Sequence, residues 1–533
     1  MMKRIHDQNE MSIFLADESR RTGTAQEICF PQSAEEIIQL LRDNPGVPVT
    51  MQGGRTGVTA GAVPEGGIVI NLSNMSQVIR LPEPDQDGPC TAVVQPGVLL
   101  LHLQEALHRR GLFFPPDPTE TTASLGGMVA CNSSGACTYR FGATRHHIRS
   151  LEMVLADGDT LSIRRGEYTA KAGRFAITTG GGRTIEGTLP QIEMPQVKKH
   201  TAGYFIRPDM DLLDLFIGSE GTLGIVTQIE LDVLPEPKHL WGAVVFFAEE
   251  ECALRFVHLL RGDETDMALQ PQAIEFFGTD TLNMLRESQR AGAALTDMTE
   301  IPAGCAVYTE FASEDRDALE PLCAQLGQFI LEAGGDPKDS WFAFRGPDML
   351  RLKDFRHAAP VCVNERVSEL RKTIPTITKL GTDMSVPDRR LDEVFAMYRE
   401  DLAREGFQTS LFGHIGNNHL HCNIIPRSEE EYRRGKELYT RWAEEVVRMG
   451  GSVSAEHGIG KLKVWLLQKL YTEEELAAML ELKHLFDPQM RLNPGNIFGV
   501  CQRLVVDFAL LRWVFCSLWL LHESNWPGCG SKP

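Results

Sequence analysis

The sequence predicts an α+β protein with more than one domain. At 533 residues the chain is too long for one ordinary hydrophobic core, so two or three domains are expected. From residue 240 to about 450, strand-like runs alternate with amphipathic helical stretches, which is typical of an α+β domain. The first 235 residues instead contain strand-like runs that pass into glycine-dense loops, and Pro235-Glu-Pro237 marks a linker and a domain boundary.

The composition narrows the classes of function and the compartment. The chain is acidic, with 72 Asp and Glu against 53 Lys and Arg and no basic block, which argues against a nucleic-acid partner. Twelve cysteines occur without a Cys-x-x-Cys pair, so reduced thiols are favoured over disulfides, and an iron–sulfur cluster or a Cys-rich zinc site is disfavoured. The N-terminus has no apolar region that would indicate a secretory signal, so we expect a cytoplasmic protein.

The N-terminal part is predicted to begin with a helix and to continue into a strand and a glycine-rich loop. Ser33-Ala-Glu-Glu36 is an N-cap signal before the apolar residues of 37–41. The run 48–62 is a strand followed by a loop whose glycines allow backbone N–H groups to approach an anion such as a diphosphate. The loop is neither the Gly-x-Gly-x-x-Gly fingerprint nor a Walker A loop. Phosphate binding and a plain glycine turn therefore both remain open on this loop alone.

A proline-rich run at 114–135 follows, with many small and hydroxyl-bearing residues. We expect it to form an extended wall against a flat, polar ligand rather than to pack like a core segment. Residues 151–163 predict a hairpin that turns at Asp157-Gly158. Residues 164–198 lack periodicity and predict a long surface insertion, with a lid as one role for it. A second glycine-dense run occupies 215–226.

After the linker, helices and strands are both predicted. Helices are expected at 250–261, 314–333, 388–405, 428–449 and 472–486, and strands at 241–248, 306–311, 411–415 and 420–425.

The last two of these strands carry the residues with the richest chemistry. Asn417-Asn418 stands between them, and Asn tolerates the left-handed backbone of a tight hairpin turn. If these two residues form the turn, His414 lies directly across from His421. Side chains alternate between the two faces of a strand. The residues that then share the face of His414 are His419, His421 and Asn423.

A later segment, Ser454-Ala-Glu-His-Gly-Ile-Gly-Lys461, adds a carboxylate and another imidazole. Two His and one Glu are a common ligand set for a divalent metal that keeps an open coordination position. The alternative is a polar hairpin with ordinary surface histidines, while the Glu-His pair caps the next helix. That alternative leaves the hairpin histidines unexplained, so the combination favours a metal. Zinc, manganese, iron and cobalt all suit these ligands, and zinc or manganese is expected.

Taken in this order, the motifs resemble the flavoprotein superfamily of vanillyl-alcohol oxidase and p-cresol methylhydroxylase. Within it, the chain is similar to the branch of FAD-linked D-lactate, glycolate and D-2-hydroxyglutarate dehydrogenases, over about residues 10–498. The resemblance implies a two-domain α+β flavoprotein. Its parts are an FAD-binding domain of two α/β subdomains (1–235), an α+β cap domain (236–455), a segment returning to the FAD site (456–498) and an apolar tail of unknown role (499–533).

The resemblance also implies which residues hold FAD. The pyrophosphate loop lacks the His that carries covalent flavin in some relatives, so non-covalent FAD is expected. The implied residues are Gly53, Gly54, Arg55, Thr56 and Gly57 in that loop; Pro116, Asp117, Thr119, Ser124, Gly126, Gly127, Asn132, Ser134 and Gly135 in the wall; Glu220, Gly221, Thr222, Gly224 and Ile225 in a late strand; and Asn493 at the active-site end of the cofactor.

At the hairpin, the resemblance implies roles for individual side chains. The metal ligands match His414, His421 and Glu456, the catalytic base matches His457, and an amide near the substrate matches Asn423. Arg356 and Lys379 stand where the family often places cations for a substrate carboxylate, although the surrounding sequence matches less well, and a solvated surface charge is the alternative for each. The family often has Gly-Asp-Gly-Asn-Leu-His where this chain has Gly-Asn-Asn-His-Leu-His. His419 is therefore an extra imidazole that either competes for the metal or supports it.

The implied reaction is metal-assisted oxidation of a small D-2-hydroxy acid (D-lactate, glycolate or D-2-hydroxyglutarate class) to the 2-oxo acid, with the hydride passing to flavin N5. The electrons would leave to a quinone, an electron-transfer flavoprotein or a cytochrome. One alternative is the non-redox alkyl-dihydroxyacetone-phosphate synthases, which carry a run of histidines where this chain has Ala455-Glu456-His457. A carboxylate there favours the hydroxy acid. Another alternative is a flavin-binding subunit without its own catalysis.

The tail contains an apolar run at 504–521 that Asp507 and Arg512 interrupt. The run is short for a membrane-spanning helix, and central charges make spanning costly. Interfacial anchoring at the inner face of a membrane is one interpretation. A tail packed on the protein and a tail without function are the others.

Overall fold

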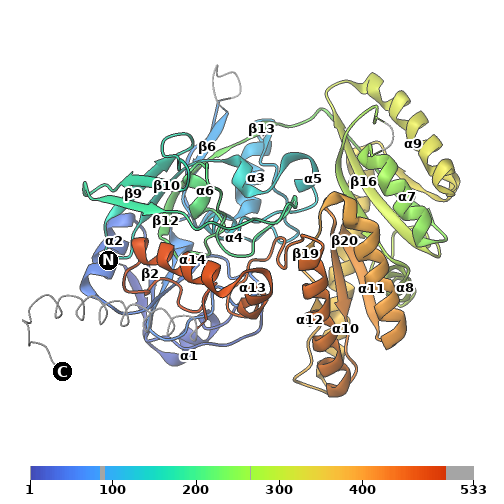
Figure 1. Ribbon diagram of the computed structural model, residues 1–533. Coiled ribbons are helices and arrows are strands. Elements are labelled where there is room, and N and C mark those ends of the chain that lie inside the picture. Colours follow the sequence, from blue (N-terminus) through green and yellow to red (C-terminus); the bar gives the residue numbers. More distant parts are fainter. Residues whose placement is uncertain (1, 84–89, 264–265, 500–533) are drawn as a thin grey trace, which may run out of the picture.

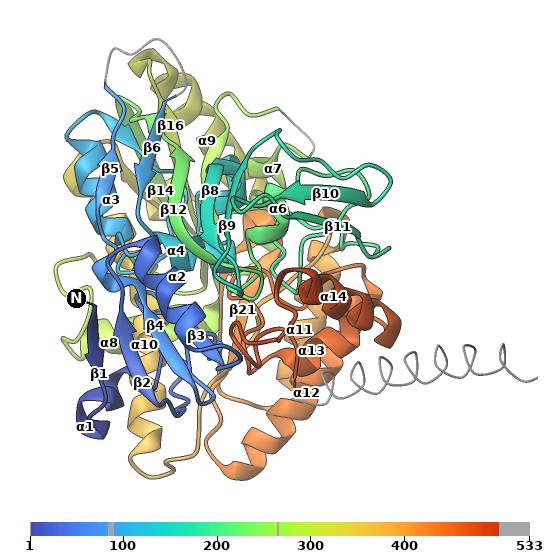
Figure 2. The same cartoon turned by 90° about the vertical axis from the view of Figure 1, so that its left-hand side faces the viewer.

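The computed structural model describes residues 2–83, 90–263 and 266–499, which form three main sheets flanked by helices (Figure 1). The predicted α+β class is confirmed. In Figure 1 the first two sheets lie on one side of the molecule, and the third sheet with its helices lies on the other. Figure 2 shows the first sheet below the second.

The first sheet is parallel at its centre. Its order is β1-β2-β4-β3; β2 and β3 run parallel to β4, and β1 is antiparallel to β2. The predicted N-cap is present, because Ser33 Oγ accepts from Glu36 N at 3.4 Å, and the helix buries its apolar face against this sheet. The elements are β1 (Lys3–Ile5), β2 (Glu27–Phe30), α2 (Ala34–Asp43), β3 (Val49–Gln52) and β4 (Ile68–Asn71).

The second sheet is antiparallel, in the order β5-β6-β12-β8-β9. The predicted hairpin is confirmed: β8 pairs with β9, and Gly158 has the positive φ of 78° that its turn requires. Helix α3 buries three leucines in the core. The elements are β5 (Val78–Arg80), β6 (Thr91–Val94), α3 (Leu100–His108), β8 (Ile148–Val154), β9 (Thr160–Arg164) and β12 (Ile225–Asp232).

The proline-rich run is only partly the extended wall that its composition predicts. Its second half forms helix α4 (Leu125–Cys131), which Ser124 caps at its start and Asn132 ends in the left-handed conformation. Leu125, Met128 and Val129 are buried, so this half does pack in the core. Leu125, Met128 and Val129 have the i, i+3 and i+4 spacing of a helix, but the glycines and small residues around them made this pattern hard to recognise in the sequence.

The predicted surface insertion at 164–198 contains regular structure that its lack of periodicity did not indicate. Strands β10 (Arg174–Thr178) and β11 (Thr184–Thr188) form an antiparallel hairpin inside it. Phe175 and Ile177 are buried while the residues beside them are exposed, which is the alternation of a half-buried strand. Only Phe175 and Ile177 alternate in β10, and Ile185 is the single apolar side chain of β11, so the alternation is too short to stand out in the sequence.

The third sheet has the order β17-β14-β16-β15-β20-β21-β18, and β19 also pairs with β21. The four strands expected here are present, and the regions that the sequence did not predict include β15 (Pro271–Phe277), α8 (Thr279–Arg290) and α10 (Gly346–Arg371). Its strands are β14 (His239–Phe247), β15 (Pro271–Phe277), β16 (Cys305–Ser313), β17 (Trp341–Ala343), β18 (Leu380–Gly381), β19 (Met384–Ser385), β20 (Thr409–His414) and β21 (His419–Ile424).

Helices cover both faces of the third sheet. Val244 and Phe246 of β14 pack with α8 and α10, whereas Val245 and Phe247 join the large core that contains α7 and α9. This alternation is the period of two expected for a strand buried on both faces. The helices are α7 (Glu250–Arg261), α8 (Thr279–Arg290), α9 (Leu319–Ala333), α10 (Gly346–Arg371), α11 (Leu391–Glu405) and α12 (Glu429–Arg448).

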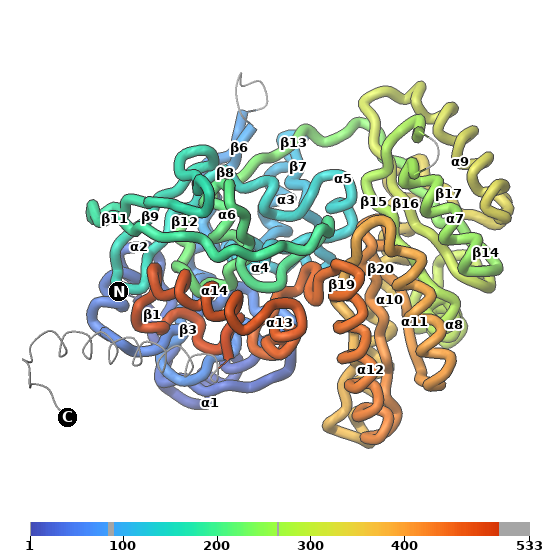
Figure 3. The backbone as a smooth tube through the Cα atoms, in the orientation of Figure 1, coloured from blue at the N-terminus to red at the C-terminus, as the bar shows by residue number. Residues whose placement is uncertain are grey.

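The segment after α12 crosses to the first two sheets (Figure 3). It contains α13 (Val464–Leu470) and α14 (Glu473–Phe486). Lys483 is buried and donates to Thr222 O at 2.7 Å. Arg491 donates to four backbone carbonyls, among them Val47 O and Asn44 O, and Leu492 forms a parallel bridge with Val49 of β3. The segment therefore completes the N-terminal part of the molecule.

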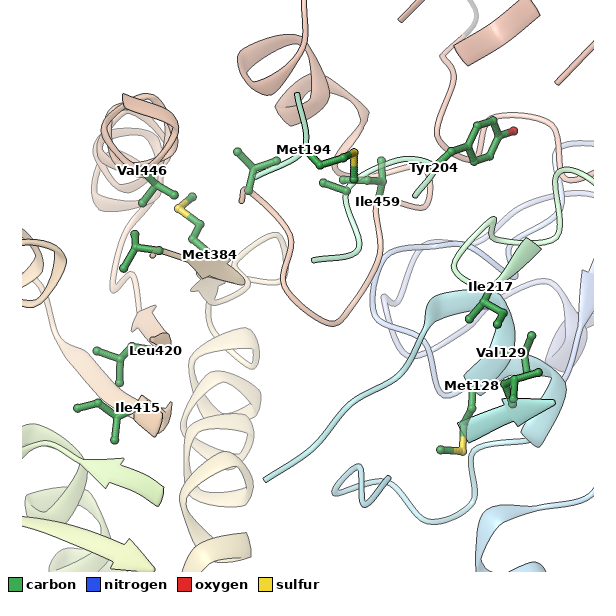
Figure 4. Close-up of a cluster of buried hydrophobic side chains, with 14 of the residues drawn as sticks. Met128, Val129, Met194, Tyr204, Ile217, Met384, Ile415, Leu420, Val446 and Ile459 are labelled. Atoms are coloured by element: carbon green, nitrogen blue, oxygen red, sulfur yellow. The ribbon is translucent and has the colours of Figure 1, made fainter. Parts of the chain in front are cut away.

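One large apolar cluster joins the second and third sheets, whereas the strands of the first sheet pack in two separate clusters. Figure 4 shows three groups of its side chains: Ile415, Leu420, Met384 and Val446 beside the third sheet, Met194, Ile459 and Tyr204 in the connecting segments, and Met128, Val129 and Ile217 around α4. The cluster includes Ile415 and Leu420 of the histidine hairpin itself.

Short elements complete the chain: α1 (Gln8–Met11), β7 (Leu112–Phe113), α5 (Thr138–Phe141), α6 (Leu213–Phe216) and β13 (Leu234–Pro235). Within the described ranges, the helices are all too short or too polar to cross a membrane. The apolar run at 504–521 lies outside the described residues.

Candidate functional site

The histidine hairpin pairs β20 with β21 in a register that differs from the prediction. His414 lies opposite His419, and Phe412 lies opposite His421. The connection is a 3-10 turn over Ile415–Asn417 that ends at Asn418 in the left-handed conformation, rather than a two-residue turn. The expected pairing of His414 with His421 is therefore wrong by two residues. Because a strand repeats every two residues, this shift leaves the three imidazoles on one face.

Glu456 joins these imidazoles at one point. One ligand atom from each of His414, His419, His421 and Glu456 lies within 4.8 Å of the others. His414 Nε2 is 3.3 Å from Glu456 Oε2, and His421 Nε2 is 3.3 Å from Glu456 Oε1. The structure thus brings the three predicted ligands together with the additional imidazole of His419. Such a set of imidazole and carboxylate donors suits a divalent transition-metal ion.

The other nitrogen of each predicted histidine ligand meets an acceptor from a neighbouring strand or segment. His414 Nδ1 is 2.7 Å from Glu275 Oε1 on β15, and His421 Nδ1 is 3.3 Å from the carbonyl oxygen of Thr382. Burial acts to raise the pKa of Glu275, but His414 and the nearby cations Arg356 and Lys199 lower it. Glu275 is a residue that the sequence reasoning missed. Its signal was a lone carboxylate within an apolar strand.

Two further side chains reach Glu456 from the first part of the chain. Lys199 Nζ and Ser134 Oγ each donate to Glu456 Oε2 at 3.0 Å, and the Lys199 side chain is fully buried. Burial acts to raise the pKa of Glu456, but Lys199 and the imidazoles of His414 and His419 hold it well below its usual value. Ser134 was expected beside the cofactor. Lys199 was missed, because the pair Lys198-Lys199 looks like an ordinary charged surface in the sequence.

Asp383 organises the segment that carries Glu456. Its carboxylate accepts from the backbone N–H groups of Glu456 (3.1 Å) and His457 (3.2 Å), and from Ser454 Oγ and Lys463 Nζ, each at 2.7 Å. Burial acts to raise the pKa of Asp383, but His457, Lys463 and His419 lower it strongly. A single Asp before the short strand β19 gave no signal in the sequence.

His457 occupies the more open side of the cluster. Its side chain is 35% exposed, with Nδ1 3.3 Å from Asp383 Oδ1 and Nε2 3.4 Å from Glu456 Oε1. A carboxylate at Nδ1 fixes the orientation of the ring and favours a proton on that nitrogen. Nε2 is then the nitrogen that is able to accept a proton.

The predicted substrate cations differ in their surroundings. Arg356 on α10 is 9% exposed on its side chain, and its Nη2 lies 3.7 Å from Asp117 Oδ2 in the expected cofactor wall. It therefore lies between that wall and Glu275. Lys379 Nζ donates to Asn364 at 3.0 Å, and burial and the nearby Arg20 lower its pKa. Among the described residues, Lys379 has no contact with the histidine cluster.

The predicted amide Asn423 is buried in β21. Its Nδ2 donates to the carbonyl oxygens of Ser410 at 3.3 Å and His421 at 3.1 Å. It lies on the same face of the strand as His421, as the alternation predicts.

The expected pyrophosphate loop follows β3 and packs against the start of α4. Gly54 N donates to Ser124 Oγ at 3.3 Å, and a Cβ at Gly53 would lie 2.0 Å from that oxygen, so glycine is required there. Arg55 has a positive φ of 59°. A Cβ at Gly57 would meet no atom within 4 Å, so the loop backbone is open on that side. This open glycine backbone fits a phosphate group. Thr56 lies within the same loop.

Several residues expected along the wall have structural contacts as well. Asn132 Oδ1 accepts from Arg145 N at 2.9 Å. A Cβ at Gly126 would lie 2.6 Å from Pro96 Cβ, and one at Gly135 would lie 2.3 Å from the carbonyl oxygen of Asp117. These glycines allow close packing beside the cofactor wall. The remaining residues of the wall prediction are Pro116, Thr119 and Gly127.

Glu220 and Asn493 connect the late strand to the returning segment. Glu220 accepts from Ile459 N at 2.6 Å and from Gly460 N at 2.8 Å, and burial raises its pKa to about 7. Asn493 Nδ2 donates to the Glu220 carbonyl oxygen at 2.6 Å, and Asn493 Oδ1 accepts from Met51 N at 2.8 Å. These bonds hold the Glu456–His457 segment beside the glycine loop. The same strand prediction includes Gly221, Thr222, Gly224 and Ile225.

Comparisons with known proteins identify two domain families in the chain. The family described as "FAD binding domain" matches residues 25–164, and that described as "FAD linked oxidases, C-terminal domain" matches residues 236–497. Glycolate oxidase subunit GlcD of Bacillus subtilis is 28% identical over 478 residues, which cover 89% of this chain and 88% of the relative. D-lactate dehydrogenase of Anaerostipes hadrus is 28% identical over 509 residues, which cover 91% and 92%.

D-2-hydroxyglutarate dehydrogenase of Stutzerimonas stutzeri is 28% identical over 490 residues, which cover 89% of this chain and 90% of the relative. Among solved structures, an alkyldihydroxyacetonephosphate synthase aligns with a TM-score of 0.63 at 16% identity, over 92% of this chain and 82% of that chain. This last likeness shows the fold alone. The two matched domains place the chain in the family of FAD-linked oxidases, which are flavin-dependent oxidoreductases.

Proposed function

We propose that the protein oxidises a small D-2-hydroxy acid of the D-lactate, glycolate or D-2-hydroxyglutarate class to the 2-oxo acid. The observation that carries the proposal is the cluster of His414, His421 and Glu456, with His457 beside it. Relatives that are named for glycolate, D-lactate and D-2-hydroxyglutarate support this substrate class.

The reaction removes a proton from the hydroxyl oxygen and a hydride from the α-carbon. When bound, FAD supplies the hydride acceptor at N5, and a divalent ion held by His414, His421 and Glu456 supplies positive charge that favours loss of the hydroxyl proton. His457 Nε2 accepts that proton, and Asp383 at Nδ1 stabilises the resulting imidazolium. A positioned base of this kind contributes about 10²–10⁴-fold to the rate.

Cations and amides would orient the substrate. Arg356 is nearly buried, and its Nε has no hydrogen-bond partner among the described residues, so the guanidinium has donors left for a carboxylate. Asn423 extends the polar face of β21 beside the imidazoles. Lys379 would act only as a positive charge at a greater distance, because its contact is with Asn364.

The cofactor would lie along the glycine loop, the wall and the late strand at the residues named above, without a covalent bond to the protein. We also propose the division into an FAD-binding part (1–235), a cap (236–455) and a returning segment (456–498). In this arrangement Ser134 and Lys199 of the FAD-binding part donate hydrogen bonds to Glu456. The proposed metal ligand Glu456 is therefore in direct contact with the part of the chain that would hold the cofactor.

The test is the visible flavin spectrum of the purified protein under anaerobic conditions. D-lactate, glycolate, D-2-hydroxyglutarate and the L forms are added in turn, before and after treatment with a chelator. We expect one D-hydroxy acid, or glycolate, to bleach the flavin, and the bleaching to stop after chelation. A flavin that none of them reduces contradicts the proposal and shifts the choice towards the non-redox synthase reaction. A colourless protein that cannot be reconstituted with FAD contradicts the flavin assignment itself.

A further inference from the structure

His419 is a histidine of the cluster that the proposed reaction does not use. Its side chain is fully buried on β21; Nδ1 lies 3.8 Å from Glu456 Oε2, and Nε2 lies 3.2 Å from Asp383 Oδ1. Within the described part of the chain, neither nitrogen has a partner in hydrogen-bonding geometry. Leaving a buried polar group without a partner costs about 1–3 kcal/mol. The position of this ring therefore needs an explanation.

The ring is arranged like the two predicted histidine ligands. Each of the three imidazoles directs one nitrogen to Glu456 and the other to an acceptor on a neighbouring segment. Histidines that bind metals usually donate their free ring N–H to a carboxylate or a carbonyl oxygen. These oxygens are Glu275 Oε1 for His414, the Thr382 carbonyl oxygen for His421 and, at 3.2 Å but outside hydrogen-bonding geometry, Asp383 Oδ1 for His419.

The distances allow all four groups to share one ion. One ligand atom from each lies within 4.8 Å of the others. Two nitrogen ligands on opposite sides of an ion, each about 2.1 Å from it, are about 4.2 Å apart. Small side-chain movements therefore suffice. His457 also approaches Glu456, at 3.4 Å, but it is 35% exposed and lies outside this group of four.

We propose that His419 binds the ion through Nδ1, which makes the ligand set three imidazoles and one carboxylate. The inference rests on the metal dependence in the proposed function. Nε2–H then donates to Asp383, so both nitrogens of the buried ring have partners. A set dominated by imidazole favours iron, cobalt, nickel or zinc over manganese and magnesium. Four protein ligands leave room for a substrate only if the ion accepts a fifth.

The test measures metal affinity rather than turnover. The FAD-loaded protein is stripped of metal and titrated with Zn²⁺ or Mn²⁺ against a competing chelator, for the unaltered protein, for His419→Asn and for His147→Asn. His147 is a buried histidine whose Nε2 contacts the Phe141 carbonyl oxygen, away from the cluster. Loss of a partner behind a ligand typically weakens binding 10–100-fold. Because His419 is itself a ligand, His419→Asn should weaken Zn²⁺ binding more than about 100-fold. Mn²⁺ binding should weaken less, and His147→Asn should leave both unchanged.

Three outcomes separate the possibilities. Unaltered Zn²⁺ affinity in a folded, FAD-containing His419→Asn protein overturns the inference. X-ray absorption at the zinc edge of the unaltered protein counts imidazole ligands without any variant: three support the inference and two overturn it, while metal dependence survives. An unaltered protein that binds none of these ions contradicts the metal in the proposed function, and the inference fails with it.

Discussion

Lys199 should weaken metal binding, and Lys199→Met should strengthen it. Lys199 Nζ is 3.0 Å from Glu456 Oε2. A metal–carboxylate bond is about 2.1 Å long, so an ion on that oxygen lies at most about 5 Å from the ammonium group. At 5 Å, a unit charge and a dication repel by about 1.7 kcal/mol in bulk water and by about 6.6 kcal/mol at an effective dielectric constant of 20. The lower figure alone corresponds to about a tenfold change in affinity.

The assay is a competition titration of metal-stripped protein with Zn²⁺ and a chelator of known affinity. Lys198→Met is the matched control, because it removes the same charge one residue earlier, where the ammonium pairs with Asp388 at 3.3 Å and is 42% exposed. We expect Lys199→Met to bind at least about tenfold more tightly. Lys198→Met and the charge-conserving Lys199→Arg should stay close to the unaltered protein.

Weaker or unchanged binding by Lys199→Met, with the fold and FAD retained, would refute the electrostatic reasoning. Lys199 would then act mainly by holding the Glu456 carboxylate and the Gly135 carbonyl oxygen in place.

Three further predictions test the base, the returning segment and the response to acid. His457→Ala should slow flavin reduction by about 10²–10⁴-fold in a stopped-flow experiment while FAD stays bound; an unchanged rate excludes His457 as the base. Lys483→Met removes the ammonium group that pairs with the buried Asp487, whose remaining partners are the backbone N–H groups of Arg491 and Leu492. It should lower the free energy of unfolding by about 3–5 kcal/mol in urea, against at most about 1 kcal/mol for the surface control Lys469→Met; equal losses refute this. Burial lowers the pKa of His147 to about 4 from 6.5. As the pH falls, the imidazole is therefore protonated in the unfolded chain before it is protonated in the folded protein. About 3 kcal/mol of stability that is present above pH 6.5 is lost as the pH falls to 4. In His147→Gln, the urea midpoint of unfolding should depend less steeply on pH over that range. A pH dependence as steep as that of the unaltered protein contradicts the role of His147.

The local sequence pattern predicted that the three imidazoles share one face of the hairpin, but it did not predict the register in which the two strands pair. The alternation of side chains along a strand put His414, His419 and His421 on one face, because that rule depends only on spacing. The register depended on the turn, and a 3-10 turn over Ile415–Asn417 is not distinguishable from a shorter one in the sequence. Helix α10 was missed for a similar reason, since Pro360 stands inside it and suggests a break.

The residues that surround the cluster could not be predicted from the sequence, because they reach it through contacts between distant parts of the chain. Lys199 and Glu456 are 257 positions apart, and Glu275 and His414 are 139 apart. No periodicity links such pairs, and a single sequence carries no record of them. The resemblance assigned the roles of ligand and base to Glu456 and His457, because a family motif preserves long-range information that spacing does not. Glu275, Asp383 and Lys199 were not among the motif residues used, so only the structure identified them.

The bridge between Val49 and Leu492 has a consequence for how the chain is made. An edge of the first sheet is covered by residues that the ribosome adds more than four hundred positions later, and until then that edge can pair with other chains. Contacts of such long range also slow folding. A nascent chain therefore has no complete flavin pocket until almost all of it has been translated. Cofactor loading is expected to follow synthesis rather than to accompany it.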